Sequence, residues 1–151
     1  MIKSIYETHL EVTEIDEALH FYEKLGLQVA LKLEERKAAF LYVGKDKQML
    51  GLWQVPEEKK VIKRHFAFGV ELDFLQKSLL WLKEQGIEPK QAFGKEPIEP
   101  IVHTWMPAAS VYFEDTDGNE LEFISLLDSE PESEPRIVYL SEWINSSKWK
   151  K

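Results

Sequence analysis

The chain has 151 residues, enough for one domain with a real core or for two small units that share a core. Its net charge of −8 at pH 7 argues against nucleic acid or an anionic membrane as a partner, because proteins that bind them concentrate lysine and arginine. The absence of cysteine excludes disulfides and thiolate metal sites, and no apolar run approaches the length of a membrane span. We therefore expect a soluble cytoplasmic protein.

The first part of the chain, residues 1–55, predicts a β-α-β-β-β module. Residues 2–12 alternate as a strand does, and apolar residues at helical spacing then run from an N-cap at Thr13 to a C-cap at Gly26. Polar turns separate three further strand-like runs, which are residues 27–33, 38–43 and 48–54.

The same order of elements returns in residues 62–127, after a charged linker at 56–60. The expected elements are a strand at 64–72, a helix between Asp73 and Gly86, a short strand near 90–93, a Pro-rich loop at 94–107 and a hairpin at 110–124. The duplication predicts two modules of one kind.

The hairpin holds a carboxylate on a rigid strand. Runs of aromatic and β-branched residues flank the turn at 115–119, in which Gly118 and Asn119 can take positive φ. Because side chains alternate along the second strand, Glu122 points away from the face that carries Phe123. Taken alone, Glu122 would be read as a solvated residue of the strand.

The C-terminal stretch, residues 128–151, differs from the two modules. Residues 128–135 form an acidic, proline-bearing linker, residues 136–140 predict an extra strand, and Ser141 could cap a short helix. The apolar residues of this extension must cover either the protein's own core or a second subunit. We expect a homodimer in which the extension completes the contact between subunits.

Two histidines and one glutamate occupy corresponding strands of the two modules. His9 lies in the first strand of the first module, His65 in the first strand of the second, and Glu122 in the last strand, each opposite the face that packs on the helix. Two imidazoles and a carboxylate suit a divalent transition metal such as Fe, Mn, Ni, Co or Zn, and leave positions open for substrate. Each residue taken singly is more often structural than a ligand, so the prediction of a metal site rests on their correspondence.

The chain resembles the vicinal oxygen chelate superfamily, which includes glyoxalase I, extradiol dioxygenases, fosfomycin-resistance thiol transferases and bleomycin resistance proteins. The resemblance covers about residues 1–127 and rests on the paired modules, on Phe-Tyr-Glu-Lys-Leu-Gly-Leu at 21–27 and on Asp-Thr-Asp-Gly-Asn-Glu-Leu-Glu-Phe at 115–123, where Thr116 replaces the family's usual proline. It implies an α+β fold in which two βαβββ modules form a curved, barrel-like mixed sheet with helices outside, followed here by a C-terminal extension.

The resemblance also implies a metal centre of His9, His65 and Glu122. Glyoxalase I adds a glutamate on the fourth strand of its first module, whereas residues 49–53 contain no carboxylate here, which argues against lactoylglutathione lyase activity.

The last segment of the domain also resembles an extradiol dioxygenase signature. The matching positions are Ile101-Val102-His103, Val111-Tyr112, Asp115, Gly118 and Glu122. It implies that His103 and Tyr112 hydrogen-bond a catecholate near the metal. The acid/base histidine of those dioxygenases has no counterpart between Trp53 and Arg64.

The predicted function is that of a divalent-metal-dependent enzyme, such as a dioxygenase, lyase or isomerase, that chelates a small oxygen-rich substrate. Glu122 would be both ligand and general base, with His103 and Tyr112 beside the reacting atoms. Trp53, Trp105 and Tyr112 could line the pocket, with the loop at 94–107 as its lid. Three alternatives stay open: a metal-free binding protein of the bleomycin-resistance kind, a fosfomycin-type thiol transferase, and an interaction module that works through its Trp-bearing extension.

Overall fold

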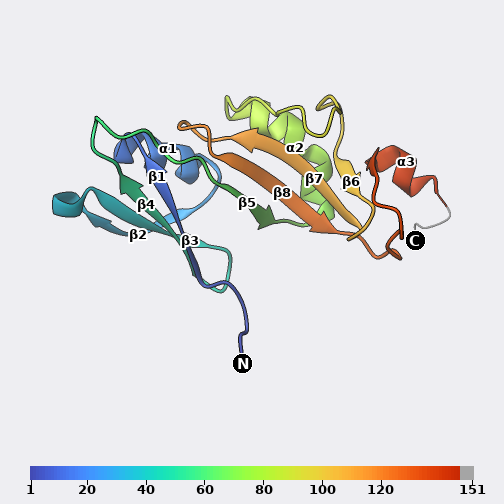
Figure 1. Cartoon of the computed structure of the whole chain (residues 1–151), viewed down its shortest axis with the longest axis horizontal. Helices are drawn as coiled ribbons and strands as arrows, with labels where there is room; N and C mark the ends of the chain where they lie inside the picture. Colours follow the sequence, from blue (N-terminus) through green and yellow to red (C-terminus); the bar gives the residue numbers. More distant parts are fainter. Residues whose placement is uncertain (147–151) are drawn as a thin grey trace. The chain divides into compact units, whose positions relative to one another are not determined.

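The computed structural model describes residues 1–146 and divides them into two compact units (Figure 1). The first unit contains residues 1–64 together with the turn at 115–119. The second contains residues 65–114 and 120–146. Each unit has one mixed sheet of its own, whereas the resemblance implied one curved, barrel-like sheet formed by both modules.

The first unit has the predicted order of elements. They are β1 Glu7–Val12, α1 Ile15–Lys24, β2 Gln28–Leu33, the 3-10 turn η1 Glu34–Arg36, β3 Ala38–Val43 and β4 Gln48–Gln54. The strands are ordered β1-β4-β3-β2, with β1 parallel to β4 and the other pairs antiparallel. α1 packs on one face of this sheet through buried residues that include Leu19 and Tyr22. The opposite face is thereby left for His9.

Helix α1 ends as predicted but begins differently. Gly26 takes φ +91°, the left-handed conformation expected of a C-terminal cap. The N-cap is Glu14 rather than Thr13. Both the hydroxyl and the amide of Thr13 donate to the Asp117 carboxylate, at 2.5 and 3.0 Å, and this tertiary partner takes the hydroxyl away from the helix.

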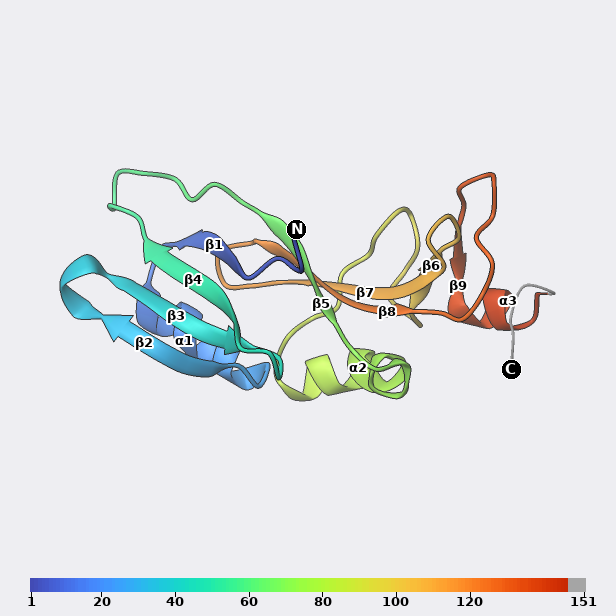
Figure 2. The same ribbon diagram turned by 90° about the horizontal axis from the view of Figure 1, so that it is seen from below.

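The second unit adds a fifth strand to a similar sheet. Its elements are β5 His65–Gly69, α2 Leu72–Glu84, β6 Ile101–His103, β7 Ala108–Glu114, β8 Glu120–Leu126, β9 Ile137–Tyr139 and α3 Leu140–Ile144. The order is β5-β8-β7-β6-β9, with β5 parallel to β8 and the other pairs antiparallel. Figure 2 shows α2 against one face of this sheet and α3 beside its edge strand, β9. No helix among residues 1–146 is long and apolar enough to cross a membrane.

The predicted strand near 90–93 and the predicted loop at 94–107 were wrong in detail. Residues 90–93 contribute only isolated bridges, because Phe93 and Gly94 both take positive φ and reverse the chain. The second strand of the module is instead β6, inside the predicted loop, where Ile101 and Val102 are buried. Prolines on either side of this short strand gave the stretch the composition of a loop. Only parts of 94–107 are therefore available as a lid.

The C-terminal extension folds onto the second unit. β9 pairs with β6, and the Trp143 side chain that follows on α3 is buried, as is Leu140. The N-cap of α3 is Tyr139 rather than Ser141. The strand and helix predicted for the extension are confirmed, and its described apolar residues cover the chain's own core. Trp149 lies outside the described residues.

Candidate functional site

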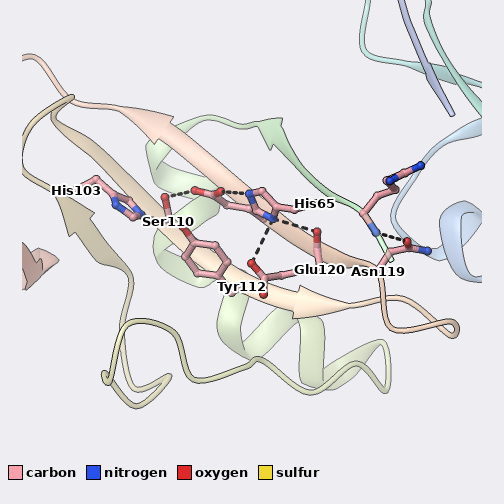
Figure 3. A network of polar contacts seen from close by, with 8 residues as sticks. His65, His103, Ser110, Tyr112, Asn119 and Glu120 are labelled. Atoms are coloured by element: carbon pink, nitrogen blue, oxygen red, sulfur yellow. Dashed lines mark hydrogen bonds and ion pairs between the residues drawn. The ribbon is translucent and has the colours of Figure 1, made fainter. Parts of the chain in front are cut away.

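The candidate site lies on the face of the second sheet that turns away from α2. Phe123 packs against Phe74 and Trp81 of α2, so the alternation of β8 places Glu122 on the other face. His65 of β5 is paired with Glu120 and Tyr112 of β7 with Glu122, so both side chains lie on the face of Glu122. Figure 3 shows the side chains of His65, Ser110, Tyr112 and His103 gathered along this sheet.

Glu122 is a buried carboxylate, with 4% of its surface exposed. The Ser110 hydroxyl, itself buried, donates to its Oε1 atom. Its other oxygen, Oε2, lies 3.3 Å from Nε2 of His65. A buried carboxylate needs such polar partners, because its charge is costly to remove from water. The site thus begins with a fixed negative charge next to an imidazole.

The hydrogen bonds of His65 fix the position of its ring proton. Its Nδ1 atom lies 3.1 Å from the carbonyl oxygen of Glu120, which can only accept, so Nδ1 donates. A neutral ring then presents the lone pair of Nε2 to the Glu122 carboxylate. Two electron-rich groups face each other favourably only when a cation, either a proton or a metal ion, binds between or beside them. The pair is therefore built to hold a cation.

A second polar pair adjoins the first. Nε2 of His103 and the Tyr112 hydroxyl are hydrogen-bonded at 2.8 Å, and both residues are buried. Burial lowers the pKa of His103 despite the opposing charge of Glu122, and burial raises the pKa of Tyr112 with help from that charge. Both groups are therefore uncharged near neutral pH. The Tyr112 ring stacks on that of His65, with centroids 6.1 Å apart, so the two pairs form one cluster.

His9, the third predicted ligand, lies in the first unit. Trp53 donates from its indole Nε1 to Nδ1 of His9 at 2.6 Å, and Glu7 lies 2.6 Å from Nε2. The structure thus brings His65 and Glu122 together within the second unit, whereas His9 belongs to the first. Among residues 1–146, no three His, Asp or Glu side chains gather into a group that could hold a metal.

Gly51 leaves the space that the His9 ring occupies. The two residues are paired in the β1–β4 ladder, and a Cβ atom at position 51 would lie 2.9 Å from Nδ1 of His9 and 3.2 Å from the Phe40 ring. Any side chain here would meet the imidazole. A fourth ligand, such as a glutamate, is therefore excluded at this position of β4 while His9 keeps its place.

We predict that Gly51→Ala displaces the His9 ring and breaks its hydrogen bond with Trp53. The crowding should lower the free energy of unfolding by about 1 kcal/mol, at the low end for overpacking because His9 is half exposed. The indole N–H resonance of Trp53 should shift in an NMR spectrum. Gly69→Ala is the matched control, because a Cβ there meets nothing within 4 Å. An unshifted Trp53 resonance would show that Gly51 does not constrain the ring.

Two residues of the cluster had no predicted role. Ser110 supports the Glu122 carboxylate, and its place two residues before Tyr112 on a buried strand was the available signal. Phe93 was assigned to a strand, although its ring contacts both His103 and Tyr112. Trp105, expected in the pocket, is exposed.

The structure is that of a protein with paired βαβββ modules, in which polar side chains occupy the sheet face that the helix leaves free. Residues 5–123 match the sequence model of the Glyoxalase/Bleomycin resistance protein/Dioxygenase superfamily. The chain belongs to this superfamily, and the resemblance inferred from its sequence is confirmed.

Individual relatives agree with this assignment. The chain is 25% identical over 130 residues to metallothiol transferase FosB of Staphylococcus saprophyticus, a match covering 81% of this chain and 76% of the transferase. Its structure is similar to integron cassette protein HFX_CASS4 from the Halifax Harbour sewage metagenome, with 29% identity, a TM-score of 0.71, and coverage of 83% of this chain and 100% of that one. Lactoylglutathione lyase from Agrobacterium tumefaciens shares the fold at 24% identity and a TM-score of 0.63, covering 82% of this chain and 94% of the lyase.

Proposed function

We propose that the protein is a divalent-metal-dependent enzyme that acts on a small oxygen-rich substrate. The metal ligands in this proposal are His9, His65 and Glu122, and the substrate binds through two neighbouring oxygen atoms. The observation that carries it is the position of His65 Nε2, which lies 3.3 Å from the buried Glu122 carboxylate. We include in the proposal a cytoplasmic location and a homodimer.

The residues present fit a divalent transition metal. Imidazole nitrogen and carboxylate oxygen are the donors that Fe, Mn, Ni, Co and Zn accept. The bond from Nδ1 of His65 to the Glu120 carbonyl is the kind of outer contact that orients a ligating histidine. Ser110 supports the carboxylate in the same way. Both ligands in the second unit are thus held in place before any metal binds.

A metal with open positions would supply stabilisation of the negative charge that develops on the two substrate oxygens. In this proposal Glu122 takes a proton from the substrate carbon or hydroxyl next to those oxygens. Tyr112 and His103, uncharged near neutral pH, can hydrogen-bond a substrate oxygen without adding charge to the site. The residues therefore support reactions that pass through an oxyanion.

Thiol transfer is the second reaction that we consider. The likeness to a metallothiol transferase supports it, and the absence of a carboxylate on β4 weighs against a glyoxalase I centre. The metal-free binding protein is the weaker alternative, because the paired His65 and Glu122 would have no evident use in it.

Elemental analysis of the protein, purified without added metal or a His-tag, tests the proposal. We expect near-stoichiometric transition metal, as isolated or after anaerobic reconstitution. Oxygen uptake with catechol and loss of free thiol with fosfomycin then distinguish a dioxygenase from a thiol transferase. If no metal binds under either condition, the chain is a metal-free binding protein and the proposed enzyme is excluded.

A further inference from the structure

Phe93 is held in a conformation that its side chain disfavours. The amides and carbonyls of Ala92 and Lys95 bond each other across a two-residue turn, at 2.9 and 3.2 Å. Within that turn Phe93 has φ +51° and Gly94 has φ +72°. Glycine adopts this left-handed region readily, but a bulky side chain there is strained. Strain of this kind persists where the surrounding structure enforces it, and it is concentrated at functional sites.

The turn places the Phe93 ring against the candidate site. Its centroid lies 5.1 Å from that of His103 and 5.8 Å from that of Tyr112, edge to face in both cases. Tyr112 in turn stacks on His65, so the rings form a continuous row that starts at a proposed metal ligand. Phe93 remains 63% exposed. An apolar surface therefore stands open to solvent beside the polar cluster.

The C-terminal segment, residues 128–146, holds the end of this turn. The Lys95 ammonium lies over the Tyr139 ring, 4.4 Å from its centroid, and 3.7 Å from the Glu142 carboxylate. The Tyr139 hydroxyl donates to the carbonyl of Glu96. The Glu99 carboxylate accepts two bonds from Ser141. Attractions of ammonium to ring and carboxylate at this range favour one position of the turn.

The same segment also holds the strand that carries His103. β9 pairs with β6, with Ile137 opposite His103. The amide of Arg136 donates to the Thr104 hydroxyl, and the amide of Glu132 to the Thr104 carbonyl. Both neighbours of the Phe93 ring are thus fixed, Tyr112 by the sheet and His103 by the sheet and the extension. This segment follows the part of the chain that matches the superfamily, residues 5–123.

We propose that Phe93 contacts the substrate as an apolar wall of the site, and that the C-terminal segment positions it there. The inference rests on the proposed function and adds the substrate class: a molecule with a flat or apolar group next to its pair of oxygens. The interaction module considered from the sequence is thereby replaced by an extension that serves the site of its own chain.

Two hydroxamates test the role of Phe93. Benzohydroxamate and acetohydroxamate present the same pair of chelating oxygens, but only the first carries a ring. Their affinities for metal-loaded protein, measured by calorimetry, give a ratio in which the contribution of the metal cancels. We expect Phe93→Ala to lower this preference for benzohydroxamate about tenfold, since stacking and apolar contact are lost. Phe93→Tyr should preserve it.

The role of the C-terminal segment is tested without deleting it. Tyr139→Leu with Glu142→Gln removes the ring and the charge that hold Lys95, while the glutamine oxygen can still accept the bond from the Tyr139 amide. We expect faster hydrogen exchange at the Lys95 amide and a two- to threefold lower preference for benzohydroxamate. Asp128→Asn, an exposed change in the same segment, is the control.

The outcomes separate this inference from the proposed function. Suppose that both hydroxamates bind only with metal and that Phe93→Ala leaves the ratio of their affinities unchanged. Phe93 then does not contact the ligand, and the inference is overturned while the proposed function stands. An unchanged ratio in the Tyr139/Glu142 variant, despite faster exchange at Lys95, overturns the positioning role. If neither hydroxamate binds the metal-loaded parent protein, the proposed function and the inference both fail.

Discussion

Replacing Glu122 by glutamine is expected to weaken the binding of divalent metal more than about 100-fold, because loss of a direct ligand should exceed the effect of losing an outer-sphere partner. The amide has the shape of the carboxylate, and its oxygen can still accept the Ser110 hydroxyl bond. It carries no charge to attract the cation that His65 and Glu122 are arranged to hold. The loss of affinity should therefore come without loss of the fold.

Glu120→Gln is the matched control for this prediction. Glu120 lies on the same strand, two residues earlier, and its side chain is largely exposed. Its contact with His65 includes the backbone carbonyl, which the substitution leaves in place. Affinities should be measured by competition with a chelator, beside thermal melts of both variants. Parent-like binding by Glu122→Gln would exclude Glu122 as a ligand.

Asp115→Ala is expected to lower the free energy of unfolding by about 3 kcal/mol or more, since it leaves several donors unsatisfied at about 1–3 kcal/mol each. This buried carboxylate accepts bonds from the amides of Asp117 and Asn119, the Asn119 side chain and the Tyr22 hydroxyl. Burial, followed by the charge of Asp115, raises the pKa of Tyr22, so its hydroxyl stays a donor at working pH. The substitution therefore leaves all of these donors without the carboxylate that accepts their hydrogen bonds.

Urea unfolding of Asp115→Ala, Tyr22→Phe and the double variant would measure this effect. Tyr22→Phe removes one donor and leaves the acceptor with its other three partners, so it should cost less. The double variant should be less destabilised than the sum of the single ones, because the two groups interact directly. A loss below about 1 kcal/mol for Asp115→Ala would contradict the role given to this turn.

Several features were predictable because their physical causes are local. The Gly-Asn turn sits between two aromatic runs, and strand alternation alone placed Glu122 opposite Phe123, as found. Gly26 and Gly86 marked the ends of the two helices through their positive φ. In each case the determining residues lie within a few positions of one another.

Other features failed because their partners are remote in sequence. Thr13 looked like a helix cap, but Asp117, 104 residues away, takes its hydroxyl. Ser141 looked like another, but Glu99 binds it, 42 residues away. β6 was hidden by flanking prolines, and only pairing with β7 and β9 makes it a strand. Phe93 was taken for a strand residue because its sequence does not reveal the turn.

The amino-acid sequence alone specifies the two modules, the superfamily and the chemical kind of residue on each strand, because period-two and helical spacing are properties of a continuous chain. Which of those residues come into contact depends on how the strands pair in the folded protein. The parallel pairing of β5 with β8 brings His65 to Glu122, 57 positions further along the chain, and no local pattern specifies that register. The contacts of the C-terminal segment with β6 and with the Phe93 turn were likewise not predictable from the sequence. They depend on the shape of a sheet that exists only after folding.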